Sequence, residues 1–143
     1  MKLTEQQRQT LRAAVNRIIP QDDYPGAWQS GVGDYLARQF EGDLRPVFDD
    51  YRNGLTALDA ESRARFQRSF SKLSEADQDR VLGLVESGEV LTTWDVAPPF
   101  FFSLLVRTTA EGFYSEPEQG GNRNALSWKM VGFEEASAPD RHG

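Results

Sequence analysis

The stretch from Phe100 to Val106 is the most hydrophobic part of the chain, and it directly follows Pro98 and Pro99. Prolines suit the first turn of a helix, where the missing backbone N–H is not needed for hydrogen bonding. The helix that follows them is apolar on nearly all sides, so most of its surface has to be buried. The run is shorter than the ~20 residues that a membrane span needs. The sequence therefore predicts a buried core helix here, and a partner subunit is the other surface that could cover it.

Apolar residues also recur every three or four positions along the earlier part of the chain, as in amphipathic helices. Thr4 offers a cap hydroxyl to the first of these helices, Gln7 stands at the capping-box position, and Pro20 ends the helix. Turn or cap residues separate the later helices, for which the predicted ranges are Val32–Phe40, about Leu44–Leu58, Asp59–Phe70 and Ser74–Gly88. No segment alternates with period two, so we expect an all-α fold, a single compact helical domain of about six helices.

Two residues in the helical part allow two interpretations each. Gly54 lies in the middle of a predicted helix, where glycine is unfavourable, so it is either a weak point or a place where another helix comes close. Trp28 lies in a connector of turn residues, Gln21–Gly31, and is either a core residue or an exposed anchor.

The chain has 143 residues with 16 basic and 22 acidic side chains, for a net charge of -6. This length suits one domain, which we place at residues 1–133, with a flexible tail at 134–143. No cluster of lysine and arginine stands against the acidic background, so neither a nucleic acid nor an anionic membrane surface is expected as a partner. The absence of cysteine excludes disulfides, cysteine-ligated zinc, iron–sulfur clusters and covalent c-type haem.

Residues that could carry catalysis are scarce. His142, the only histidine, lies in the predicted tail, where nothing holds it as a general base. Gly31-Val32-Gly33 lacks the third glycine of a dinucleotide fingerprint, and the motifs of phosphate-binding loops and serine hydrolases are missing. Carboxylates are plentiful without any pair standing out, and Asp22–Asp23 is better explained by helix capping than as a cation site. The sequence therefore predicts no catalytic, cofactor-binding or metal-ligating residue in this chain.

The segment from Glu111 to Phe133, which we call the C-terminal arm, is too aromatic for a solvated loop and too rich in glycine for a plain helix. Its aromatic residues surround a turn that contains Pro117, Gly120 and Gly121. Interfaces are enriched in such residues, but cores are rich in aromatics as well, so the residues alone leave both roles open. The candidate partner-binding residues are Phe113, Tyr114, Arg123, Trp128, Lys129 and Phe133.

Motifs spread over nearly the whole chain resemble those of one known family. The longest runs through the C-terminal arm, as Glu111-Gly112-Phe113-Tyr114-Ser115-x-Pro117, Gly120-Gly121-Asn122-Arg123 and Trp128-Lys129-x-x-Gly132-Phe133. Earlier pieces are Ile18-Ile19-Pro20, Pro25-Gly26-Ala27 and Tyr51-Arg52-Asn53-Gly54-Leu55. On these residues the chain resembles the small subunit, subunit 3, of the gluconate 2-dehydrogenase type.

The resemblance implies a non-catalytic subunit that accompanies a large flavoprotein of the glucose–methanol–choline oxidoreductase type. That partner holds FAD and oxidises a sugar or sugar acid, and a multihaem cytochrome c subunit often carries the electrons to the membrane. The small subunit is expected to help the flavoprotein fold, acquire FAD or be exported. The resemblance also favours interface over core for the C-terminal arm, with Tyr114, Arg123 and Trp128 making its contacts.

Many members of this family begin with a twin-arginine export signal, and none is visible in the opening residues of this chain. The resemblance implies a periplasmic location, reached together with the partner, and a cytoplasmic complex is the alternative. Two other roles compete with that of a permanent subunit. One is a maturation chaperone that leaves the finished flavoprotein, and the other is an independent enzyme.

Overall fold

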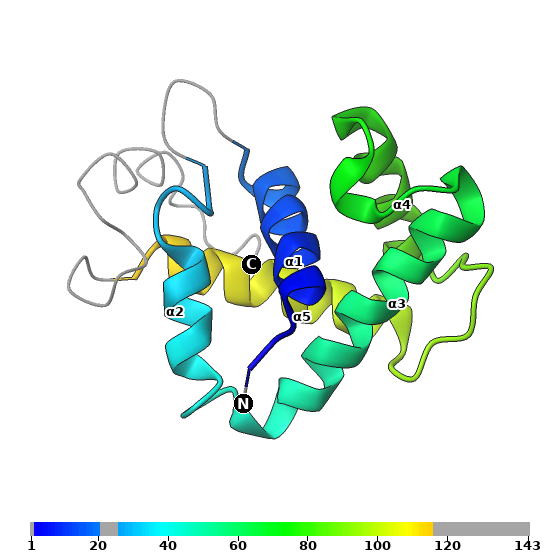
Figure 1. Ribbon diagram of the computed structural model, residues 1–143. Coiled ribbons are helices and arrows are strands. Elements are labelled where there is room, and N and C mark those ends of the chain that lie inside the picture. The colour runs from blue at the N-terminus through cyan, green and yellow to red at the C-terminus, as the bar shows by residue number, and fades with distance from the viewer. Residues whose placement is uncertain (1, 21–25, 116–143) are drawn as a thin grey trace.

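The computed structural model describes residues 2–20 and 26–115, and these residues form helices and loops without a strand (Figure 1). The described helices are α1 Glu5–Ile18, α2 Val32–Gln39, α3 Phe48–Phe66, α4 Glu75–Ser87 and α5 Pro98–Phe113, with short 3-10 helices η1 Arg45–Val47 and η2 Phe70–Lys72. The prediction of a compact all-α domain is confirmed, with five α-helices in the described residues where about six were expected.

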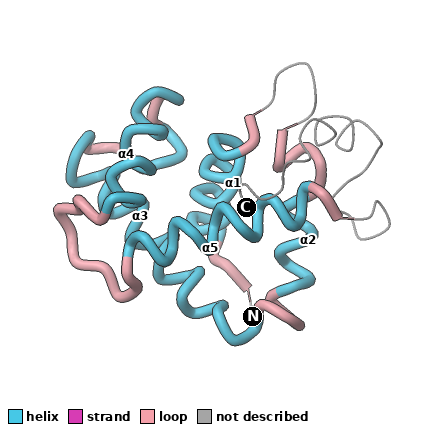
Figure 2. Tube along the Cα trace, turned by 180° about the vertical axis from the view of Figure 1, so that it is seen from behind, coloured by secondary structure: helices cyan, strands magenta, loops and turns pink. Residues whose placement is uncertain are grey.

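Helix α5 is the element around which the others are arranged. It passes behind α1 in Figure 1 and packs against α1, α2, α3 and α4. Figure 2 shows it from behind, with α2 beside one end and α3 and α4 toward the other. The side chains that α5 contributes to the interior are Phe101, Leu104, Leu105, Thr108 and Phe113. The predicted core helix over this segment is therefore confirmed.

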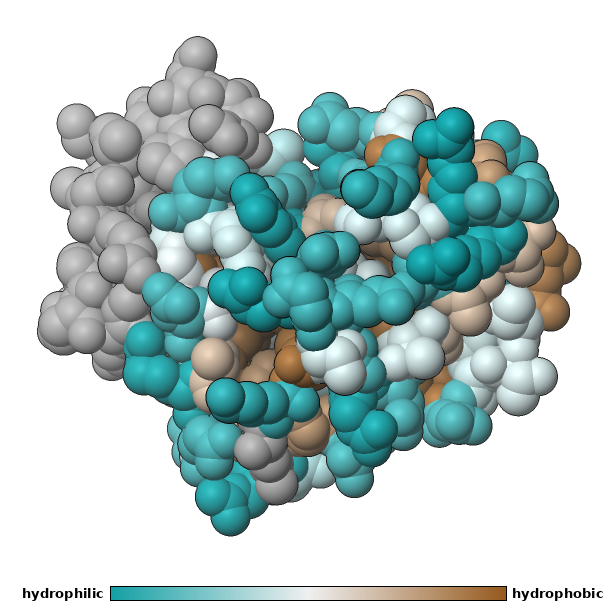
Figure 3. Space-filling view, in the orientation of Figure 1, coloured by the Kyte–Doolittle hydropathy of each residue, from teal (hydrophilic) through white to brown (hydrophobic). Residues whose placement is uncertain are grey.

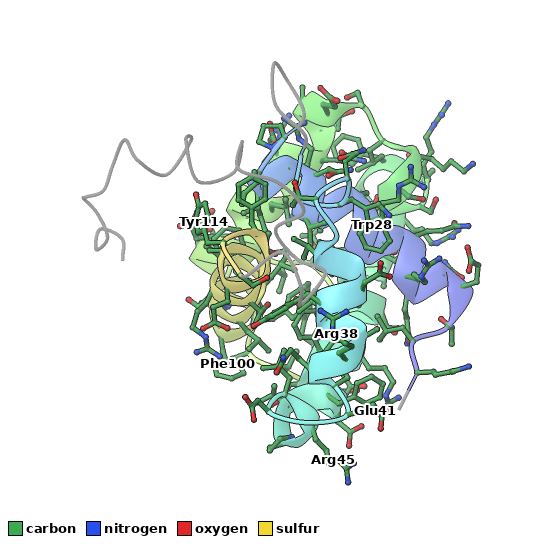
Figure 4. The ribbon with its side chains drawn as sticks, turned by 90° about the vertical axis from the view of Figure 1, so that its left-hand side faces the viewer. Trp28, Arg38, Glu41, Arg45, Phe100 and Tyr114 are labelled. Carbon is green, nitrogen blue, oxygen red and sulfur yellow. The ribbon has the colours of Figure 1, made fainter. Side chains whose placement is uncertain are left out.

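Phe100 is the exception to that prediction, because 48% of its surface is exposed. Successive residues of an α-helix point about 100° apart, so Phe101 turns into the core while Phe100 turns outward. Figure 4 shows Phe100 on the outer side of α5. The expectation that most of the surface of this helix is buried is confirmed, and Phe100 marks the one side of its first turn that the other described helices leave uncovered.

The predicted helix boundary at Asp59 is also wrong, because α3 runs without a break from Phe48 to Phe66. Asp59 is not a cap residue but a buried residue within this helix. Its carboxylate accepts hydrogen bonds from Gln6 Nε2 at 2.6 Å, Arg63 Nε at 2.8 Å and the Phe70 backbone N–H at 2.8 Å. The acidic side chain that looked like a helix start instead ties α3 to α1 and to η2.

Gly54 is a place of close approach between two helices. It is buried in α3 directly opposite Phe101 of α5. A Cβ added at Gly54 would overlap the Cγ, Cδ1 and Cε1 atoms of the Phe101 ring. Of the two interpretations of Gly54, the close approach of another helix is therefore correct. Only a residue without a side chain lets α3 and α5 pack this closely.

The capping signals in the sequence mark true helix ends. The Thr4 hydroxyl accepts a hydrogen bond from the Gln7 N–H at 3.1 Å, and the Gln7 side chain accepts from the Thr4 N–H at 2.9 Å, which completes the capping box of α1. Ser74 accepts from the Asp77 N–H at 3.1 Å at the start of α4. Gly88 ends α4 with a positive φ of 81°, a conformation that favours glycine.

Candidate partner-binding site

The base of the C-terminal arm is the last turn of α5, which holds two of the candidate partner-binding residues. Phe113 is fully buried among the core residues, whereas Tyr114 is half-buried. Their rings meet edge-on, with centroids 5.1 Å apart. Burial raises the pKa of the Tyr114 hydroxyl, so it stays neutral and can donate a hydrogen bond. Of the two, Tyr114 has surface to offer a partner, while the Phe113 ring is enclosed by its own domain.

The end of α5 is fixed against α2. A Cβ added at Gly112 would lie 2.7 Å from Cδ2 of Tyr35, so the glycine makes room for the Tyr35 ring. The Tyr114 N–H donates to the Ala110 carbonyl at 3.0 Å, and the Ser115 hydroxyl donates to the Gly112 carbonyl at 3.0 Å. These contacts fix the point from which the arm continues.

The other candidate residues of the arm, Arg123, Trp128, Lys129 and Phe133, lie outside the described residues. The same holds for the acidic pair Asp22–Asp23 and for His142. The roles given to them from the sequence stay predictions.

Trp28 is neither a core residue nor a free surface anchor. Its side chain is half-buried, and its backbone N–H donates to Asn16 Oδ1 at 3.1 Å. The ring lies so close to Gly33 of α2 that a Cβ there would stand 2.6 Å from its Cη2 atom. On the ring lies the guanidinium of Arg8, with Cζ 5.4 Å from the ring centroid, in a cation–π contact. The result is an aromatic surface held in place by α1 and α2 (Figure 4).

Sequence reasoning missed the parts that Arg8 and Gly33 play in this arrangement. Arg8 falls on the solvent side of the predicted first helix, and Gly33 belongs to the incomplete dinucleotide fingerprint. Both contacts of the Trp28 ring depend on how α1 and α2 pack, and no local pattern contains that information.

A second set of contacts fixes the loop between α4 and α5. Glu61 of α3 is fully buried, and its carboxylate accepts from the backbone N–H groups of Leu91 at 2.7 Å and Thr92 at 3.1 Å. The Thr92 hydroxyl donates to it at 2.5 Å and Arg65 Nε at 2.8 Å. Arg65 Nη2 also donates to the Glu89 carbonyl at 2.8 Å. The Glu61 carboxylate thereby fixes the loop between α4 and α5 to α3.

The ionisation of Glu61 follows from these contacts. Burial by itself raises the pKa of a carboxyl group, because it disfavours the charged form. The hydrogen bonds from Thr92, Leu91 and Arg65 act in the opposite direction and prevail, so the pKa of Glu61 falls to about 2. Sequence inspection did not single out this residue, although the Arg65 side chain one turn along the helix is a signal for an ion pair.

A buried pair of hydroxyl groups connects two helices of the core. The Tyr51 hydroxyl and the Thr108 hydroxyl form a buried hydrogen bond of 2.9 Å between α3 and α5, and burial raises the pKa of Tyr51. Over residues 2–20 and 26–115, no group of three or more histidine, cysteine, aspartate or glutamate residues is placed to hold a metal ion. Within the same ranges, no helix has the length and hydrophobicity that a membrane span requires.

Comparison with protein-family models matches residues 5–134 to the family described as gluconate 2-dehydrogenase subunit 3. The match begins at the first residue of α1 and extends through the C-terminal arm. Neither a curated protein nor a solved structure shows a significant match to the chain. The family match covers most of the chain and confirms the resemblance found in its motifs: the chain belongs to the gluconate 2-dehydrogenase subunit 3 family.

Proposed function

We propose that this chain is the non-catalytic small subunit of an FAD-dependent sugar or sugar-acid dehydrogenase. It binds and stabilises a large flavoprotein subunit of the glucose–methanol–choline type and assists its maturation or export. The observation that carries this proposal is the family match over residues 5–134, because the family is named for a subunit of a dehydrogenase complex. FAD belongs to the large subunit, a multihaem cytochrome c can join as a third component, and the complex works in the periplasm.

Two groups of residues in the structure support a binding role: the buried ionisable side chains and the half-buried aromatic rings. Among the described residues, the fully buried ionisable side chains of Tyr51 and Glu61 hold helices and a loop together. The half-buried aromatic rings, in contrast, lie at places where they can meet another protein, with Tyr114 at the base of the arm and Trp28 beside α2. Interfaces are enriched in such aromatic residues.

Substitutions in the arm test whether it forms the contact. Trp128→Ala and Arg123→Ala, co-expressed with the large subunit, are each expected to weaken association at least about tenfold, because interface tryptophan and arginine residues often dominate binding energy. The flavin content of the large subunit is expected to fall in parallel. Pull-down and flavin absorbance measure the two effects.

Arg80→Ala, on the exposed side of α4, is the matched control and is expected to bind like the wild type. Thermal unfolding of each isolated variant separates a lost contact from a lost fold. Wild-type association and flavin loading in both arm variants would show that the arm is not the contact.

A further inference from the structure

A hollow of about 340 Å³ opens between α1 and α2, next to the Trp28 ring. Leu11, Ala37 and Phe40 give it an apolar lining, and Trp28 contributes an aromatic wall. Figure 3 shows hydrophobic residues at the bottom of a depression among hydrophilic ones on this face. The volume lies at the lower end of the range for ligand pockets, about 300 Å³ upward, which suits one or two side chains.

The charge of this hollow is opposite to that of the protein. Its charged lining residues are Lys2 and Arg8, both exposed, and no acidic side chain lines it among the described residues. The chain as a whole has a net charge of -6. Asp34 lines a neighbouring hollow, to which Arg8, Trp28 and Gly33 also belong. An apolar lining with two cations favours an occupant that joins an apolar group to a negative charge.

Arg8 is held in a position to bind such a group. Its guanidinium lies on the face of the Trp28 ring, at 5.4 Å from the centroid. A cation–π contact uses none of the guanidinium N–H groups as a conventional hydrogen-bond donor, so they can form paired hydrogen bonds with a carboxylate. The Trp28 backbone is held by Asn16 and its ring packs against Gly33, so little side-chain freedom of this residue is lost on binding.

We propose that this hollow receives an anchor segment of the large dehydrogenase subunit, in which an apolar side chain fills the hollow and a neighbouring aspartate or glutamate pairs with Arg8 and Lys2. The inference rests on the proposed function, because it takes the occupant from the subunit that this chain accompanies. A protein segment fits better than a small metabolite. Sites for small ligands enclose most of the ligand, whereas this one lies open on the surface with both of its cations exposed.

Filling the hollow tests the apolar half of the proposal. Ala37 is exposed and lines the hollow, so Ala37→Trp fills the space without disturbing the core. Association with the co-expressed large subunit is expected to weaken at least tenfold. Ala76→Trp adds the same side chain on the exposed side of α4 and is expected to leave association unchanged.

Charge reversal and cross-linking test the ionic half. Arg8→Glu is expected to weaken association at least tenfold, whereas Arg12→Glu, an equal change of charge on an exposed residue of α1, is expected to have less than a threefold effect. In the wild-type complex, a zero-length carbodiimide reagent should join the Lys2 amine to an aspartate or glutamate of the large subunit, identified by mass spectrometry. This cross-link reports on the site even if a variant fails to fold.

The possible outcomes separate this inference from the proposed function. If the wild-type chain does not associate with a large dehydrogenase subunit, both fail. If it associates, but Ala37→Trp and Arg8→Glu bind like the wild type, the hollow is not the docking site. A Lys2 cross-link confined to this chain or to a second copy of it also overturns the proposal.

Discussion

Replacing Glu61 with glutamine is expected to lower the free energy of unfolding by about 3 kcal/mol at pH 7, the usual scale for breaking a buried charge pair. The carboxylate accepts hydrogen bonds from the backbone of Leu91 and Thr92, from the Thr92 hydroxyl and from Arg65. A glutamine side chain offers only one oxygen as an acceptor. Its NH2 group, itself a donor, would point at other hydrogen-bond donors. Urea denaturation followed by circular dichroism measures the loss. Glu86→Gln, on the exposed side of α4, is expected to stay within about 0.5 kcal/mol of the wild type.

The effect of Glu61→Gln is expected to depend on pH. The pKa of Glu61 is lowered from 4.5 to about 2 in the folded protein, which corresponds to about 3 kcal/mol. A lowered pKa means that the folded state binds this proton more weakly than the unfolded state. The stabilisation is therefore complete above about pH 5 and is lost as the pH falls toward 2. The difference in stability between wild type and variant should shrink over that range, and a difference that stays constant down to pH 3 would contradict the lowered pKa of Glu61.

Gly54→Ala is expected to destabilise the domain by about 2–3 kcal/mol, although alanine favours helix formation by up to about 1 kcal/mol. The added methyl group would overlap the Phe101 ring, which is fully buried and cannot swing aside. Tyr51 and Trp94 surround that ring, each with its centroid 6.0 Å away. The helices α3 and α5 would have to separate, and thermal or urea unfolding would record the loss.

Gly83→Ala is the matched control for this prediction. Gly83 is exposed in α4, and apart from its two chain neighbours and the backbone of its own helix, no atom lies within 4 Å of a Cβ added there. Alanine at this position is expected to raise stability by up to about 1 kcal/mol, because only helix propensity changes. In the double variant Gly54→Ala/Phe101→Leu, part of the loss should be recovered, since the smaller side chain leaves room for the methyl group. Equal effects of the two alanine substitutions would disprove the close contact.

The helices were largely predictable because their signals are local. The capping box at Thr4 and the apolar run after Pro99 depend on neighbouring residues alone, and each marks a helix of the structure. Asp59 shows the limit of such signals. An acidic residue after Leu58 resembles a helix start, but its carboxylate is satisfied by Gln6 and by Phe70, and those contacts exist only once the chain has folded.

The candidate site was predictable to a smaller extent for the same reason. Aromatic residues are visible in a sequence by their type, so Trp28 and Tyr114 could be selected as candidates. The contacts around these rings cannot be seen in the sequence. Arg8 of α1 contacts Trp28, and Tyr35 of α2 contacts Gly112 of α5, only once the helices have packed. Whether an aromatic ring faces the core or a partner is decided by packing, as Phe113 and Tyr114 illustrate at adjacent positions. The family motifs supplied the functional direction that these residues alone could not give.

The most direct test of the central proposal is size-exclusion chromatography with native mass spectrometry of the complex purified from its source. The proposal predicts that the chain co-elutes in fixed ratio with a large subunit that contains FAD. It also predicts that the isolated chain shows neither flavin absorbance nor sugar oxidation. A mature flavoprotein that elutes without the chain would identify it as a transient chaperone. Flavin and sugar oxidation in the isolated chain would contradict the proposal outright.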